Sequence, residues 1–357
     1  MIKFMSKILI STVVFLSLNI SFVNAYSVDE LIELALENSP QIMQSQLDIE
    51  SKKVNLYDLK KQLDKSEEND LSKVEIETLK IKYDYSKKIL DLYSSQTKSL
   101  QTTKIKKSIY EYIYQTNLLE QSKADLDNQK LNFDLASSKL NQGAISKLEF
   151  DSLKNNYESA QLSYQNSIDS LDKKREELNI LLGRDISLDI DISYDLDINN
   201  SNLDELDFED IYQFNLLNNI DYLNAKLNSI LSEREYNSYI VALSEISVEA
   251  RTKKISMNKS KIEYENFKDS LKSDISYELK NLMNQRKNID IKKEALDLKT
   301  LEYDLAKKQY ENGQISLTDL NDEYNDYSKS KYEYEKLIFD FNMNLLDFIG
   351  NYNIDLM

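Results

Sequence analysis

The sequence contains no cysteine and no histidine among its 357 residues. Their absence excludes disulfide bonds, thiol chemistry, zinc sites and every acid–base or nucleophilic arrangement that depends on an imidazole. Carboxylates are abundant, but their pattern is typical of solvated helix faces, and no pattern indicates a buried pocket that would raise a carboxyl pKa. We therefore expect a protein that is not an enzyme and that uses no metal and no cofactor.

Glycine and proline are also scarce. The chain has four glycines and one proline, whereas ordinary proteins contain roughly 7% and 5% of these residues. Because glycine and proline interrupt helices and form turns, their scarcity predicts few turns and long helices.

A long apolar run occurs only at the N-terminus. Lys3 and Lys7 precede an apolar run from Ile8 to Val23, and Val23-Asn24-Ala25 has the form of a signal-peptidase site. We predict that residues 1–25 are a signal peptide and that the protein is exported. Without the two lysines of this segment the chain carries 43 basic and 62 acidic residues. Such an anionic chain would repel nucleic acid, which we exclude as a partner.

The four glycines reveal an internal repeat. They form two pairs, Gly143 with Gly183 and Gly313 with Gly350, and a shift of 170 residues places Gly143 on Gly313. The apolar residues before each turn then superpose on identical steps of four, three and seven, which is typical of coiled-coil helices. The first copy has Ile105, Ile109, Tyr112, Leu119, Leu126, Phe133 and Leu140, and the second has Ile275, Leu279, Leu282, Ile289, Leu296, Tyr303 and Tyr310.

The glycines themselves predict where helices end. Gly143 and Gly313 are expected to form tight reversals between antiparallel helices, because glycine adopts the left-handed backbone conformation without strain. Gly183 and Gly350 are expected to end the second helix of each pair as C-terminal caps. A second apolar stripe predicts packing on both sides of the first helix of each pair. It comprises Leu131, Leu135 and Ala136 in one copy and Leu301, Leu305 and Ala306 in the other.

Helix lengths alternate within the first repeat. From about Ser72 to Gln142 the pattern predicts one helix of ~105 Å, at 1.5 Å per residue. The helices predicted before it (Ser27 to Lys65) and after it (Ile145 to Leu182) are each ~58 Å long. Two half-length helices laid end to end would match one full-length partner, which predicts a long rod.

The repeat also sets the expected domain boundaries. A capping box at Ser27 opens the first unit, and Asp207 opens the second in the same way; Pro40 predicts a kink or a split in the first helix. Apolar residues at alternate positions from Ile186 to Ile198 predict a strand. The expected fold is all-α, with two tandem repeats of long antiparallel coiled-coil hairpins and a short β segment between them. The first repeat covers residues 26–183, the linker with its amphipathic strand 184–206, and the second repeat 207–357.

Two such units resemble the TolC-like outer membrane efflux protein family, over nearly the whole mature chain. The most specific parts are the segments around the turns, from Leu135 through Gly143 to Glu149 and from Leu305 through Gly313 to Leu320. The resemblance implies a homotrimer whose helices form one hollow α-barrel, closed at the glycine turns, through which substrates are exported. It also implies that a periplasmic-type adaptor and an inner-membrane pump dock at the turns. The turn residues are Gln142, Gly143, Ala144, Asn312, Gly313 and Gln314.

The resemblance further implies an entrance constriction. Acidic residues just past the second turn line it in this family, and Asp319 and Asp322 occupy those positions, one helical turn apart. Three copies would place a carboxylate ring around a narrow mouth and favour cations there. Glu149 matches the acidic position of the first turn, and Tyr310 could donate a hydrogen bond to it, whereas the family's basic residue after the second glycine is Ile315 here. Simpler interpretations remain open, because carboxylates also stabilise a helix N-terminus and Tyr310 is a heptad core residue.

The chain departs from the family in one respect. Members that span an outer membrane insert two strands between the first and second helices of each repeat. Here the first gap, Lys65 to Leu71, is a polar turn, and the second, near Arg251 to Ser260, holds no pair of strands. We therefore expect a relative without these strands, placed in the cell envelope, with the outer membrane implied only by the resemblance. Two alternatives stay open: a non-transport structural coiled-coil protein of the envelope, and the pump's adaptor, which would need β-rich modules.

Overall fold

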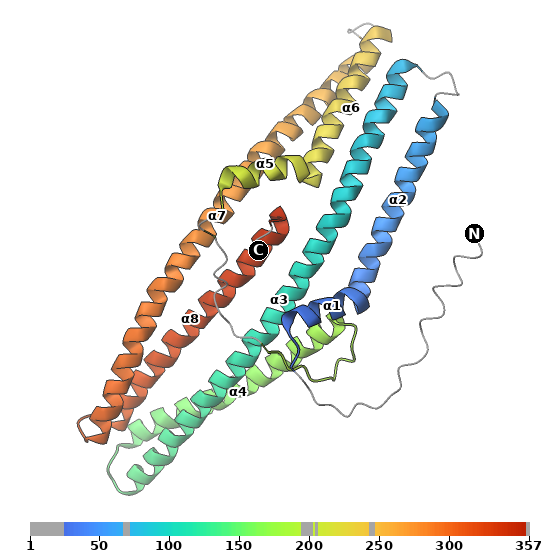
Figure 1. The fold of residues 1–357 in the computed structure, drawn as a ribbon. Helices are drawn as coiled ribbons and strands as arrows, with labels where there is room; N and C mark the ends of the chain where they lie inside the picture. The colour runs from blue at the N-terminus through green and yellow to red at the C-terminus, as the bar shows by residue number, and fades with distance from the viewer. Residues whose placement is uncertain (1–24, 67–71, 194–202, 204–205, 243–246, 355–357) are drawn as a thin grey trace, which may run out of the picture.

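The computed structural model describes residues 25–66, 72–193, 203, 206–242 and 247–354. Over these residues the chain forms eight α-helices (Figure 1). Their bounds are α1 Val28–Asn38, α2 Pro40–Ser66, α3 Lys73–Asn141, α4 Lys147–Leu181, α5 Phe208–Asn218, α6 Ile220–Ala242, α7 Val248–Glu311 and α8 Leu317–Tyr352. The predicted signal peptide and the polar turn at 67–71 lie outside the described residues, apart from Ala25.

The helices lie side by side in one elongated layer (Figure 1). α3 and α7 run almost its whole length, ~104 Å and ~96 Å for 69 and 64 residues. Toward the glycine turns α3 packs against α4 and α8, and α8 packs against α7; toward the far end α3 packs against α2 and α6, and α6 packs against α7. The order across the layer is therefore α4, α3, α8, α7 at the turn end and α2, α3, α6, α7 at the far end. The predicted rod and the matching of two short helices to one long partner are confirmed.

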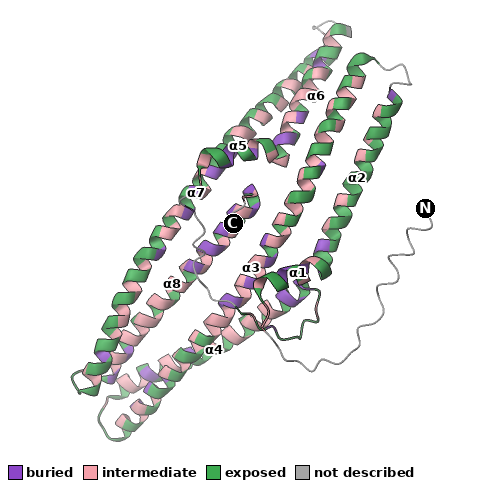
Figure 2. Ribbon diagram, viewed as in Figure 1, coloured by how far each residue is buried: buried purple, intermediate pink, exposed green. Residues whose placement is uncertain are grey.

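Apolar contacts gather where the half-length helices meet. One cluster joins α1, α3 and α4 through residues such as Leu31, Ile105 and Leu178, and a second joins α5, α7 and α8 through residues such as Ile275 and Phe348. The heptad positions that the sequence assigned are thus buried in both copies at this level. Elsewhere most residues are intermediate or exposed, because a single layer leaves both faces of each helix uncovered (Figure 2).

The first predicted helix is split, as expected from Pro40. Ser39 has extended dihedral angles (φ −67°, ψ 124°) and separates α1 from α2, since a residue that precedes proline avoids the helical region. Asn219 breaks the second repeat at the equivalent place with φ −83° and ψ 124°, although no proline follows it. The Asn219 side chain accepts a hydrogen bond from the Tyr222 amide at 2.9 Å and so caps α6. The sequence analysis missed this second break.

The two glycines expected to end helices behave differently. Gly183 follows α4 with φ +66°, as predicted, and lies against the end of α1. The prediction for Gly350 is wrong: it lies inside α8, which continues to Tyr352 and is capped by Asn353 with φ +49°. A Cβ on Gly350 would lie 3.0 Å from Thr103 Oγ1. This glycine therefore permits the close approach of α8 to α3.

The linker and the second far-end turn also differ from expectation. In the described part of the linker, up to residue 193, the expected strand is only a single parallel bridge between Tyr26 and Ile192, because the segment packs on α1 and has no neighbouring strand. Residues 194–198 of the expected strand lie outside the described residues. Arg251 to Ser260, expected to hold the second turn, lie inside α7. In the part of the chain that the structure describes, no helix is both long and apolar enough to cross a bilayer.

Candidate functional site at the glycine turns

The two glycine turns have the same backbone geometry. Gly143 and Gly313 have φ +70° and +69°. The amide of Ala144 donates to the Lys139 carbonyl and that of Gln314 to the Gln309 carbonyl, each at 2.8 Å, which satisfies carbonyls left free at the helix end. A Cβ added to either glycine would meet no described atom within 4 Å. Backbone conformation, not space, therefore requires glycine, and the turns are open to a partner.

Each turn leads into a capped helix. Ser146 Oγ accepts from the Glu149 amide at 3.1 Å and Ser316 Oγ from the Asp319 amide at 3.1 Å. Asp319 also accepts from the Ser316 amide at 2.9 Å, which completes a capping box. Hydrogen bonds from the Ser316 backbone and hydroxyl hold the pKa of Asp319 below its usual range. Asp319 thus has a local role as a helix cap in addition to any role at an entrance.

The turn ends of the two hairpins touch each other. Thr318 Oγ1 donates to Glu149 Oε1 at 2.9 Å, and Leu153 and Leu317 are buried together with Ala136. Tyr310 packs against this cluster, with Lys139 Nζ 5.3 Å from its ring centroid. The structure therefore brings Glu149 and Tyr310 to one end of the molecule, and Thr318, which the sequence analysis did not single out, donates the hydrogen bond to Glu149. Asp322 is exposed on α8, one turn beyond Asp319.

Above the turns, α3 and α8 meet through amides, which we call the amide seam. Asn132 Nδ2 donates to Asn321 Oδ1 at 2.7 Å, and these residues are 5% and 1% exposed. Gln129 Nε2 donates to Asn325 Oδ1 at 2.9 Å, one turn farther from the turns. Polar residues at steps of three and four on both helices were visible in the sequence, but nothing showed that α3 and α8 would be neighbours.

The seams inside each hairpin are aromatic instead. Phe133 of α3 stacks on Tyr157 of α4 with ring centroids 5.2 Å apart, and Tyr303 of α7 stacks on Tyr327 of α8 at 5.5 Å. Each hairpin is thus held by apolar and aromatic contacts, and the two hairpins are joined to each other at this level by neutral hydrogen bonds.

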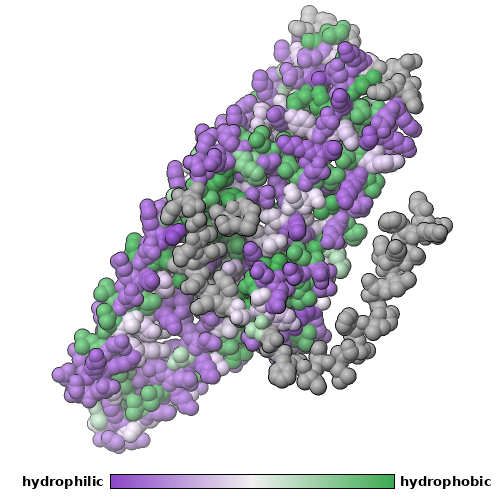
Figure 3. Space-filling view, viewed as in Figure 1, coloured by the Kyte–Doolittle hydropathy of each residue, from purple (hydrophilic) through white to green (hydrophobic). Residues whose placement is uncertain are grey.

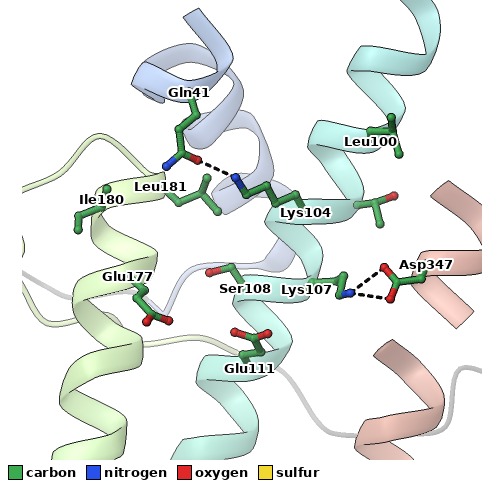
Figure 4. A pocket seen from close by; sticks show the side chains of 11 residues that line it. Gln41, Leu100, Lys104, Lys107, Ser108, Glu111, Glu177, Ile180, Leu181 and Asp347 are labelled. Carbon is green, nitrogen blue, oxygen red and sulfur yellow. Dashed lines mark hydrogen bonds and ion pairs between the residues drawn. The ribbon is translucent and has the colours of Figure 1, made fainter. Parts of the chain in front are cut away.

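A shallow groove lies farther along α3, between the end of α4 and α8 (Figure 4). Lys107 Nζ lies 2.7 Å from both carboxylate oxygens of Asp347, and Lys104 donates to Gln41 at 3.1 Å. The Glu111 carboxylate on the opposite side of the groove accepts from Lys174 at 2.8 Å. These charges are paired between helices, so the groove is better explained as a junction of the two repeats than as a catalytic site.

The two lateral edges of the layer carry apolar residues that contact nothing in the described chain beyond their own helix neighbourhood. On α4, Leu148, Leu162 and Ile180 are exposed, and at 3.6 residues per turn they lie opposite the buried Leu153 and Leu178. On α7 the exposed apolar residues lie opposite the buried Leu282 and Ile289 in the same way. These are Val248, Ile255, Ile262, Tyr277, Ile291, Leu298, Leu301 and Leu305. Apolar residues also alternate with hydrophilic ones along the visible face (Figure 3).

Comparison with known proteins shows what fold this is. No protein-family model matches the chain, and no curated protein sequence matches it. Solved structures do match. The Campylobacter jejuni CmeC outer membrane channel is 13% identical with a TM-score of 0.64 and covers 91% of this chain and 85% of its own. The outer membrane protein VceC from Vibrio cholerae is 10% identical with a TM-score of 0.67, covering 90% and 96%. CusC, described for its transmembrane channel formation, is 12% identical with a TM-score of 0.66, covering 94% and 95%.

Proposed function

We propose that this protein, which has the fold of TolC-like outer membrane channels, is the subunit of an export duct. In this proposal three copies stand side by side, their layers curl into one hollow helical tube, and cargo passes along its axis. The observation that carries the proposal is the pair of unsatisfied edges: α4 and α7 are apolar on the side that faces their own chain and also on the opposite side. Leu162 and Leu298, for example, are 64% and 62% exposed.

The two edges match in height. Leu148 lies five residues after Gly143 and Leu305 eight before Gly313. Leu162 lies 19 residues after the first turn and Ile291 22 before the second, and Ile180 and Tyr277 lie 37 and 36 residues away. At 1.5 Å per residue these pairs differ in height by at most ~5 Å. Because the turns themselves are level, joined by Thr318 and Glu149, an edge-to-edge contact needs no axial shift. Repetition without an axial shift closes a ring, whereas a shift would give an open helix.

The turns are the natural entrance of such a tube. In the proposed assembly Asp319 and Asp322 of each copy stand near the axis as a carboxylate ring, and Glu149 links the hairpins through Thr318. The exposed turn residues Gln142 to Ala144 and Asn312 to Gln314 form the surface for an adaptor and an inner-membrane pump. Export by the signal peptide at residues 1–25 brings the chain to the cell envelope. A ring of this kind distinguishes a duct from the structural spacer, which needs no lumen and no second copy.

Cross-linking tests the ring, since the chain has no native cysteine. A chain with Leu162→Cys and Ile291→Cys should form intermolecular cross-links with a short bifunctional reagent, in a ladder that ends at the trimer. Leu148→Cys with Tyr277→Cys is the control, because its sites differ by 31 residues in height, ~46 Å, and it should give no ladder. A chain that stays monomeric by native mass measurement would favour the spacer, and a ladder extending beyond the trimer would indicate a filament.

A further inference from the structure

The helices α2 and α6 hold equivalent places in the two repeats but are anchored very differently. α6 buries Tyr222, Leu223, Leu227 and Tyr236, and the Tyr222 hydroxyl lies 2.8 Å from the Tyr264 hydroxyl of α7. α2 buries only Ile42 in its first turn and Ser66 in its last. The 23 residues between them include none that is buried.

What holds the middle of α2 to α3 is weak. Lys52 Nζ lies 4.6 Å from the ring centroid of Tyr93 and Lys60 Nζ 5.7 Å from that of Tyr83. Exposed cation–π contacts contribute about 0.5–1 kcal/mol each, whereas fixing the backbone of one residue costs about 1–2 kcal/mol. Helices in proteins gain most of their stability from packing of an apolar face. The half-buried residues Ile49, Leu56 and Leu63 supply only part of that packing.

α2 has a second apolar stripe that points away from its own chain. Met43, Leu47, Val54 and Tyr57 are 50%, 66%, 61% and 72% exposed and follow one another at steps of four, seven and three. At 3.6 residues per turn this outer stripe lies on the side of α2 opposite Ile49 and Leu56. The outer stripe is thus the far-end continuation of the edge that α4 forms near the turns.

We propose that the outer stripe of α2 is covered by a second copy of this chain, and that α2 becomes ordered only when the copies assemble. The partner surface is the far-end part of α7, where Val248, Ile255 and Ile262 are exposed at steps of seven. Val54 lies 12 residues from the far end of α2 and Ile262 lies 14 from that of α7, a difference of ~3 Å. This inference builds on the proposed ring and adds that α2 acts as the element that folds on assembly.

The two surfaces also agree in charge. Lys52, Lys53, Lys60 and Lys61 flank the outer stripe of α2, and Glu249, Glu263 and Glu265 flank the far-end stripe of α7. Opposite charges around an apolar contact favour encounter between copies and fix their register. A second copy therefore supplies both the apolar cover and the complementary charges that α2 lacks within its own chain.

Hydrogen exchange measured by mass spectrometry tests the inference on the full chain. The assembled protein is compared with a monomer made by Ile291→Asp and Leu298→Asp, two edge substitutions near the turns and far from α2. Peptides from residues 40–66 should exchange at least about a hundredfold faster in the monomer, because local stability sets the rate of exchange. Peptides from residues 220–242 should keep their protection in both states. Within the assembly, Leu47→Asp with Val54→Asp should release α2 alone, whereas Val241→Asp, equally exposed on α6, should not.

The outcomes separate the two proposals. If α2 keeps its protection in the monomer, folding on assembly is overturned while the ring stands. If the unmodified chain never assembles at any concentration, the ring fails, and with it the second copy as the partner of α2. Faster exchange of α2 and α6 together would show general loosening of the far end, which also overturns the inference.

Discussion

The amide seam allows a sharp test of how the two hairpins are joined. Asn132 and Asn321 are buried, and the amide of one donates to the carbonyl of the other at 2.7 Å. Replacing only Asn321 with leucine leaves the Asn132 amide facing an apolar group. A buried donor without a partner costs about 1–3 kcal/mol. We expect each single substitution, Asn132→Leu or Asn321→Leu, to lower the free energy of unfolding by that amount.

The double substitution should behave differently. With both amides replaced, no polar group remains unsatisfied at this position, and two leucines of similar volume can pack against each other. We expect the double variant to be within about 1 kcal/mol of the unmodified chain, so the coupling between the two sites is at least ~1 kcal/mol. Exposed Asn166→Leu on α4 is the control and should change the stability by less than about 0.5 kcal/mol.

Equilibrium unfolding in urea measures these differences at one fixed protein concentration, because assembly contributes to apparent stability. The reasoning would be refuted if the two single costs simply added in the double variant. That result would mean that the two side chains do not pair in the folded chain. A stabilised double variant would also predict hairpins that part less readily, since leucines do not exchange their contact for water as amides do.

Three further predictions follow from other parts of the structure. Gly350→Ala should destabilise the chain by about 1–3 kcal/mol, because the new Cβ would lie 3.0 Å from Thr103 Oγ1; adding Thr103→Ala should restore stability, and thermal unfolding would show failure if it did not. Burial raises the pKa of Asp125, so the folded chain binds this proton more tightly than the unfolded chain, and its contribution to stability should grow as the pH falls from about 7 toward about 4. Asp125→Asn should raise the melting temperature at pH 7 and remove that growth, and an unchanged pH profile would argue against it. Asp319→Asn with Asp322→Asn should weaken several-fold the block of ion current by multivalent cations in the reconstituted assembly, and an unchanged block would count against the carboxylate ring.

Much of the fold is a local property and was readable from the sequence. The steps of seven before Gly143 and Gly313 predict long coiled-coil helices, since apolar spacing determines which side of a helix is buried. The left-handed turns follow from glycine, and the capping boxes from serine with an acidic residue three positions on. The resemblance to TolC-like channels depends on these same segments, and the solved structures with this fold agree with it.

Other features depended on which helices become neighbours. Gly350 looked like a cap, but α8 continues past it because Thr103 of α3 leaves no room for a side chain there. The alternating residues near Ile192 looked like a strand, but in the described chain they find one bridge to Tyr26 instead of a sheet. The roles of Asn132 and Asn321 were invisible until α3 and α8 lay side by side.

The sequence by itself determined helix lengths, turns and the two apolar sides of each edge helix, because these properties repeat within a few residues along one chain. Only the tertiary structure decided which of those sides are covered, which polar groups pair across a seam, and which edges are left for another copy. These are contacts between residues that are far apart in the chain, and no local pattern encodes their geometry.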